Sequence, residues 1–272
     1  MYKWVTNSVV MAENEHGSNI YCISLSDELV FIDAGMLNEY TLKFREAMEV
    51  YYGKEASTLF ITHAHIDHIR AMNAFSDCEI VAAEAARPRF NAHMAIDFNE
   101  ERLSRMEGVF PYIREGVQDG EFLEPTKWVD ANYIYKGVGF NVHGGHSACS
   151  SSVFIPDENC VALGDLVQSE RQPYFGESDT DINAWIGALD AWEGSDIAHV
   201  FPGHGPPVER DYLGGVSGYF RDLTESLRSL RTENIPEEEV HLNEYLPSGY
   251  WPEDSPRKSA HYYSIRRLYA SL

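Results

Sequence analysis

The chain has 272 residues, of which 44% are hydrophobic and 24% are charged, so it can bury a full core and is too apolar to be mainly disordered. Its formal net charge of −22 disfavours nucleic acid as a partner, because nucleic-acid binding depends on Lys and Arg side chains that neutralise phosphates. No apolar stretch reaches the roughly 18 residues that a membrane span needs, and the first residues lack a basic segment followed by an apolar run. We therefore expect a cytoplasmic protein without a membrane or nucleic-acid partner.

The first part of the chain predicts strands around one helix. Apolar and β-branched runs indicate strands at 20–25 and 29–32, and helical spacing of apolar residues indicates a helix from Tyr40 to Tyr51. A strand at 58–61 runs directly into Thr62-His63-Ala64-His65-Ile66-Asp67-His68, and another strand is expected at 80–83. The polar cluster thus lies at a strand end, where functional sites are commonly built.

The second part repeats this pattern after an interruption. Strands are predicted at 133–135, 140–143, 152–155, 160–163 and 199–201, and amphipathic helices at 182–189 and 216–230. Residues 84–124 show weak helical periodicity and read as a helical insertion. Two groups of strands with helices between and after them favour a four-layer αββα sandwich. We assign a catalytic domain to residues 1–210 and a helical C-terminal extension to 211–272.

The residues with metal-binding chemistry come in one dense cluster and three later positions. In His63-Ala64-His65 an extended backbone directs both imidazoles to the same side, and Asp67 and His68 follow at once. Further candidates follow strands and stand beside glycine, which lets the backbone turn tightly near an ion: His146, Asp165 and His204. A mixed set of imidazoles and carboxylates suits Zn²⁺ or a similar cation.

These residues resemble the metallo-β-lactamase superfamily, whose HxHxDH motif is matched by His63, His65, Asp67 and His68. The family's later His, Asp and His are matched by His146, Asp165 and His204. The spacing from His146 to Asp165 and from Asp165 to His204 resembles that of glyoxalase II-like and lactonase-like members. The resemblance covers roughly residues 18–210 and also includes Phe31-Ile32-Asp33-Ala34-Gly35, where Asp33 is expected to support the metal loops.

The resemblance implies a role for each matched residue. His63, His65 and His146 would hold one ion, Asp67, His68 and His204 a second, and Asp165 would bridge them. The two divalent ions, expected to be Zn²⁺ with Fe or Mn as alternatives, would activate a bridging hydroxide for hydrolysis. Asp67 could also orient that hydroxide. Apart from the resemblance, Tyr174 follows Asp165 closely and could donate its hydroxyl to a substrate oxygen, although aromatic packing is favoured for it.

The substrate class stays open at this point. The resemblance favours a small-molecule thioester, lactone or other ester, but the same two-metal arrangement can attack phosphorus, so a small-molecule phosphodiesterase is the alternative. A catalytically silent binding or sensor protein is less favoured because no ligand of the motif is missing. The expected partner is a small molecule, and a homodimer is compatible with the exposed insertion.

The other candidates are given ordinary structural roles. We expect His143 to support the site or pack rather than bind metal, and we treat His93, His241 and His261 as ordinary histidines and Cys149 as a small buried thiol. Arg257 and Lys258 could meet an anionic substrate, although a solvated helix face is favoured.

The insertion is expected to act as a lid. It joins His68 to His146, two residues that must converge on one site, so both of its ends are tethered near the mouth of that site. We expect Phe90, Met94 and Phe110 to form an apolar wall that selects an acyl or aromatic substrate.

Overall fold

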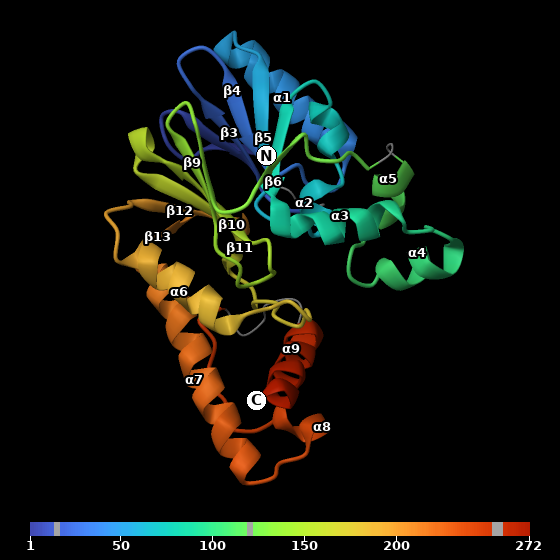
Figure 1. Cartoon of the computed structure of the whole chain (residues 1–272), viewed down its shortest axis with the longest axis vertical. Helices are drawn as coiled ribbons and strands as arrows, with labels where there is room; N and C mark the ends of the chain where they lie inside the picture. Colours follow the sequence, from blue (N-terminus) through green and yellow to red (C-terminus); the bar gives the residue numbers. More distant parts are fainter. Residues whose placement is uncertain (14–16, 119–121, 252–257) are drawn as a thin grey trace.

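Two sheets form the centre of the molecule (Figure 1). The computed structural model describes residues 1–13, 17–118, 122–251 and 258–272. The first sheet has seven strands, which follow one another in chain order across the sheet: β1 (Tyr2–Trp4), β2 (Val9–Ala12), β3 (Ile20–Ser24), β4 (Leu29–Ile32), β5 (Ala56–Phe60), β6 (Glu79–Ala83) and β7 (Lys127–Val129). The second sheet has six strands, in the order β13 (Val208–Glu209), β12 (His199–His204), β11 (Cys160–Gln168), β10 (Ser151–Ile155), β9 (Val138–Val142) and β8 (Asn132–Tyr135).

The strand directions bring the ends of several strands to one edge of the sandwich. Strands β4 to β7 are parallel, and so are β11 and β12, whereas the remaining pairs are antiparallel. Two backbone hydrogen bonds join the sheets at this edge: the amide of Ser151 donates to Thr62 O at 2.8 Å, and that of Asn19 to Gly203 O at 2.7 Å. The loop after β5 therefore lies beside the start of β10, and the segment before β3 lies beside the end of β12.

Helices cover the outer face of each sheet. Helix α1 (Asn38–Tyr52) packs on the first sheet, and α6 (Ile182–Glu193) and α7 (Tyr212–Thr232) pack on the second. The core between the sheets is made of inward-facing side chains of both, among them Met11, Ile32, Phe60, Phe140, Val153 and Phe201. These four layers confirm the predicted αββα sandwich.

The segment between the two halves is helical, as predicted. It contains α3 (Arg87–Met94), α4 (Glu100–Met106) and α5 (Ile113–Gln118), which extend sideways from the sandwich in Figure 1. Short helices α2 (Ile66–Ile69), η1 (Met72–Phe75) and η2 (Glu84–Ala86) precede it, and η3 (Pro156–Glu158) forms the turn predicted between β10 and β11.

The last part of the chain forms a helical arm. Helix α7 leads away from the sandwich to α8 (Glu237–Val240), and α9 (Lys258–Ser271) returns toward it (Figure 1). Leu223, Leu227 and Ile265 belong to the same buried cluster as the outer face of the second sheet. No helix in the described parts of the chain is long and apolar enough to cross a membrane. A domain boundary near residue 210 remains a prediction.

Four strands were not expected, and one strand is longer than expected. The sequence pattern did not predict β1, β2, β7 or β13. Strand β2 is buried along its whole length, so it lacks the polar and apolar alternation that marks a strand with one wet face. Strand β11 continues to Gln168 instead of stopping at Leu163. Its pairing with β12 shifts register at Gly164, which adopts a φ of 50°, and the two strands pair again beyond this point.

Candidate metal centre

The HxHxDH segment forms the turn between β5 and α2. His63 and His65 lie in the loop that follows β5, and Asp67 and His68 lie in the single helical turn of α2. All four are at least mostly buried, with exposed fractions of 1% for His63, 5% for Asp67 and 0% for His68. The loop is supported by His93 of α3, whose Nε2 lies 2.9 Å from the carbonyl oxygen of Ala64. The sequence pattern gave no reason to single out His93.

The other three candidates come from the second sheet. His146 lies in the loop between β9 and β10, and His204 is the last residue of β12. Asp165, expected just past a strand, lies inside β11 after the irregularity at Gly164. Small residues are needed here, because a Cβ atom at Gly164 would lie 2.7 Å from Thr62 Cβ and one at Gly203 would lie 2.8 Å from the carbonyl carbon of Gly164.

Three imidazole nitrogens converge on one point. His65 Nδ1 lies 3.0 Å from His63 Nε2 and 2.9 Å from His146 Nε2, and Asp165 Oδ2 lies 3.7 Å from His146 Nε2. Together these four residues place ligand atoms within 4.8 Å of one another. The arrangement matches the group that the resemblance implies for the first ion, with Asp165 at its edge.

The second group lies beside the first. His204 Nε2 lies 3.2 Å from Asp67 Oδ2 and 3.5 Å from Asp165 Oδ1, and His68 Nε2 lies 3.2 Å from the same Asp165 oxygen. Asp165 therefore presents one carboxylate oxygen to each group, an arrangement that allows it to bridge two ions. Gln168 Nε2 donates to Asp165 Oδ2 at 2.6 Å and helps to hold this orientation.

The residues fit divalent cations. His68 Nε2, His204 Nε2 and Asp165 Oδ1 are buried, yet within the described chain they make no hydrogen bond of acceptable geometry. Unpaired buried polar atoms are costly, and a cation between them satisfies all three at once. Five imidazoles and two carboxylates form a donor set that suits Zn²⁺. The structure brings all seven residues together, and their assignment as ligands remains a prediction.

A buried hydrogen-bond network sets the orientation of two of these rings. Asp33 accepts from the Thr62 amide at 2.8 Å, from Thr62 Oγ1 at 2.7 Å and from His68 Nδ1 at 2.8 Å. Because the Thr62 hydroxyl gives its proton to Asp33, it can accept from His63 Nδ1 at 3.2 Å, which leaves His63 Nε2 free to bind a cation. Asp33 thus supports the metal loops, as the sequence suggested.

Burial keeps most of these imidazoles neutral. It lowers the pKa values of His63, His65, His146 and His204, in part with help from neighbouring imidazoles. For His68, burial alone would lower the pKa, but the carboxylates of Asp165 and Asp33 outweigh it and raise the pKa well above its usual range. Cation binding at His68 therefore requires release of a proton.

The two carboxylates stay ionised. Burial alone would raise the pKa of Asp67, but the imidazoles of His204 and His68 lower it below its usual range. The same competition, with His204 and His68 again the main partners, lowers the pKa of Asp165 well below its usual range. Two anionic oxygens are thus available to cations at neutral pH.

The metal groups form the floor of a cavity of about 640 Å³. Its described lining falls into three groups of residues: the ligand candidates His65, Asp67, His146 and Asp165, the loop residues Tyr174 and Glu177, and a wall made of Gly108, Val109, Phe110, Ser259, Ala260 and Tyr263. Tyr174 faces this cavity, and burial, with Glu177 nearby, raises the pKa of its hydroxyl to about 12. That hydroxyl therefore keeps its proton at neutral pH and can act as a donor.

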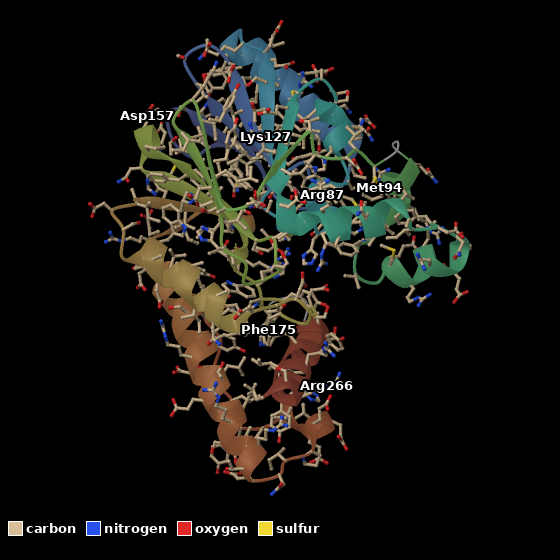
Figure 2. All side chains as sticks on the ribbon, in the orientation of Figure 1. Arg87, Met94, Lys127, Asp157, Phe175 and Arg266 are labelled. Carbon is tan, nitrogen blue, oxygen red and sulfur yellow. The ribbon has the colours of Figure 1, made fainter. Side chains whose placement is uncertain are left out.

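The lid prediction is right for one of its three residues. Phe110 lines the cavity, but Phe90 is 1% exposed and packs against Trp128 in the core, and Met94 is 40% exposed on the outer part of α3 (Figure 2). Helix α3 turns its aromatic side chain toward the first sheet, and the described residues of the insertion that line the cavity lie in the loop after α4. The sequence pattern also missed Tyr263, because nothing local to the tail indicates that α9 returns to the site.

The remaining candidates do not join the two metal groups. His143 Nε2 lies 2.7 Å from Ser152 Oγ, and Cys149 is buried, as expected. His261 lies within α9 and contacts Tyr219 Oη at 2.7 Å. The ring of His241 packs against the ring of Tyr262. Arg257 lies outside the described residues, and nothing is described for the side chain of Lys258.

Comparison with known families agrees with this geometry. A model of the metallo-beta-lactamase superfamily matches residues 14–204, well over half of the chain. The chain belongs to this superfamily. The type 2 metallo-beta-lactamase of Bacillus sp. (strain 170) is 27% identical over 200 residues, covering 72% of this chain and 70% of the relative, and that of Bacillus cereus is 26% identical over the same length. We conclude that the protein is a hydrolase of the metallo-β-lactamase superfamily with a His/Asp metal-binding cluster.

Solved structures share the fold at low identity. The inverting sec-alkylsulfatase Pisa1 from Pseudomonas sp. has a TM-score of 0.73 and 16% identity, over 100% of this chain and 50% of the sulfatase. The chain thus spans about half the length of that protein. A metallo-beta-lactamase from Pontibacter korlensis has a TM-score of 0.60 and 18% identity, over 82% of this chain and 99% of that one.

Proposed function

We propose that this protein is a dinuclear metal-dependent hydrolase of a small-molecule thioester, lactone or other ester. The observation that supports this most directly is the position of Asp165, which presents one oxygen to each of two ligand groups on the floor of a cavity. Two divalent ions, with Zn²⁺ best suited to the donor set, lower the pKa of water and polarise a substrate oxygen when they are bound there.

The residues of the chain divide the remaining tasks. His63, His65 and His146 would hold the first ion, Asp67, His68 and His204 the second, and Asp165 both. Asp67 would also orient the water molecule by accepting a hydrogen bond from it. Tyr174, whose pKa of about 12 keeps it protonated, can donate to the substrate oxygen that gains negative charge.

The walls of the cavity favour a neutral substrate with an apolar group. Phe110 and Tyr263 supply aromatic surface, and Val109 adds an aliphatic side chain. Among the described residues of the lining there is no Lys or Arg, while Glu177 adds a negative charge. An acyl or aromatic ester can use such walls, whereas an anionic ester depends on the ions alone for charge compensation.

Hydrolysis of a charged ester is the second candidate. The fold likeness to a sec-alkylsulfatase extends over the whole chain, including the helical arm, and a two-metal centre can also act on phosphodiesters. This candidate requires the anion to be held by the metal ions, since the described walls offer no cationic side chain.

A substrate panel with a metal-site control tests the proposal. The protein, loaded in turn with Zn²⁺, Mn²⁺ or Fe²⁺, is assayed with p-nitrophenyl butyrate, an acyl thioester, an aliphatic lactone, bis(p-nitrophenyl) phosphate and a secondary alkyl sulfate. We expect turnover of a neutral ester class and its loss in Asp165→Ala. Turnover confined to the phosphate or sulfate would favour the second candidate, and equal rates in the wild type and the variant would show that this centre does not perform the reaction.

A further inference from the structure

Glu177 is a charged side chain of the cavity lining that the metal-ligand assignment does not use. It lies in the loop between β11 and α6, and its side chain is 30% exposed. Its Oε1 lies 3.7 Å from His65 Nε2, and its Oε2 lies 3.6 Å from Arg89 Nη2 of α3. The carboxylate therefore stands between a ligand candidate and the helical insertion.

The ring of His65 has one nitrogen that forms no hydrogen bond with the described residues. Its Nδ1 points to the convergence point of the first ligand group, 3.0 Å from His63 Nε2 and 2.9 Å from His146 Nε2. An imidazole that binds a cation through Nδ1 carries its proton on Nε2. That Nε2 is buried, and the carboxylate of Glu177 lies 3.7 Å from it.

The other two imidazoles of this group each have a partner for the second nitrogen. His63 Nδ1 lies 3.2 Å from the Thr62 hydroxyl, and His146 Nδ1 donates to the carbonyl oxygen of Tyr174 at 2.8 Å. Ligand histidines almost always donate their second N–H to a carboxylate, carbonyl or water, and this contact fixes the tautomer and the ring orientation. Among the described residues, Glu177 can complete the pattern at His65.

The loop that carries Glu177 is held from the C-terminal helix. Ser264 Oγ accepts from the Phe175 amide at 3.1 Å, and His261 Nδ1 donates to Pro173 O at 3.0 Å. The Tyr263 ring packs so closely on Gly176 that a Cβ atom there would lie 2.8 Å from it. Figure 2 shows Phe175 at this junction, where the sandwich meets α9.

From these contacts we propose that Glu177 is a positioning residue for the first ion: it accepts the Nε2 proton of His65 and holds that ring with Nδ1 toward the cation. This inference rests on the dinuclear site proposed above. Arg89, which also binds Asp179 Oδ1 at 2.9 Å, and the contacts from α9 place the carboxylate for this task.

The affinity of each ion tests the role of Glu177 independently of catalysis. Apoprotein is titrated with Zn²⁺ against a chromophoric chelator and, in parallel, with Co²⁺ followed by its absorption spectrum. Glu177→Leu keeps the size of the side chain but removes the hydrogen-bond acceptor. We expect it to lower the affinity for one of the two ions by about 10- to 100-fold and to change the affinity for the other by less than about threefold. Glu177→Gln, whose amide oxygen still accepts, is expected to restore most of that affinity.

Arg89→Met is the matched control, because it removes the partner of Glu177 in α3 but leaves the acceptor in place. We expect it to affect ion affinity less than Glu177→Leu does. Two ions bound by Glu177→Leu as tightly as by the wild type, equal loss of both ions, or a loss in Arg89→Met as large as in Glu177→Leu would overturn the role of Glu177. A wild-type protein that binds fewer than two ions would instead contradict the dinuclear site itself.

Discussion

The floor and the wall of the cavity are built in different ways. The floor consists of the two metal groups, whose side chains are mostly buried and held by partners within the sandwich such as Asp33 and Gln168. The wall consists of a loop after α4 and the start of α9, where Val109 is 59% exposed and Tyr263 is 44% exposed. A rigid floor can define the reaction while an apolar, more accessible wall selects the substrate, and changes on the two sides should therefore have different consequences.

The largest effect is expected from Asp165→Ala on the floor. This change removes the oxygens that face both groups, so both ions should bind more weakly. Losing the ions removes several kcal/mol of transition-state stabilisation, which corresponds to a fall in kcat/KM of more than about 1000-fold. Elemental analysis of purified protein should find about two ions per chain in the wild type and fewer in the variant. A fully active wild type with one ion would refute the dinuclear assignment.

The next largest effect is a pH dependence of stability in the helical arm, whose helix α9 carries part of the wall. His261 is buried between Tyr219 and Pro173 O, and burial lowers its pKa to about 4. In the unfolded chain its pKa is near 6.5, so the unfolded state binds more protons between these values and stability falls as the pH drops from about 6.5 toward 4. Full protonation of this one group lowers the free energy of unfolding by about 3 kcal/mol.

Urea unfolding at pH 7 and pH 5 measures this contribution. His261→Gln should lose less stability on acidification than the wild type. The difference between the unfolding free energies of the two proteins at each pH excludes the contribution of the metal-site histidines, because both proteins share them. Equal acid sensitivity in wild type and His261→Gln would show that another group is responsible.

Asp33→Asn tests how the floor is supported. Asn also tolerates the left-handed backbone that Asp33 adopts with a φ of 57°, so the turn should be kept. The amide cannot replace all three accepted hydrogen bonds, and we expect the second ion to bind about 10- to 100-fold more weakly. Competition with a chelator measures this, and Asp157→Asn on the exposed turn η3 should bind both ions like the wild type.

The sequence could predict the floor far better than the wall. His63, His65, Asp67 and His68 stand within one turn, so their convergence follows from local geometry, and the strand pattern brings His146, Asp165 and His204 to the same edge. The wall depends on long-range packing. Tyr263 reaches the cavity because α9 folds back along α7, and the spacing of apolar residues within a helix does not predict how two helices pack on each other. Phe90 illustrates the same difficulty, because helical spacing alone cannot tell a core-facing aromatic residue from a cavity-facing one.

Changes in the wall should alter selectivity without altering metal content. Tyr263→Ala and Phe110→Ala each remove aromatic surface, and we expect the preference for a long acyl or aromatic ester over the acetyl ester to fall about tenfold. Tyr263→Phe keeps the ring and serves as the control. Unchanged relative rates in both alanine variants would mean that neither side chain contacts the substrate, whereas loss of metal would place these residues in the support of the floor.

The smallest effect is expected at His143, which lies three residues before His146 but outside both ligand groups. Its Nε2 contacts the Ser152 hydroxyl at 2.7 Å, its ring faces Trp192, and burial lowers its pKa, so it is a neutral packing residue at neutral pH. We expect His143→Ala to change kcat/KM by less than about threefold and to retain both ions, since it removes one hydrogen bond worth about 1 kcal/mol to stability. His146→Ala provides the contrast, because it removes a ligand candidate and should lower occupancy of the first ion. A loss of activity in His143→Ala as large as in His146→Ala, with metal content retained, would assign His143 a direct part in the reaction.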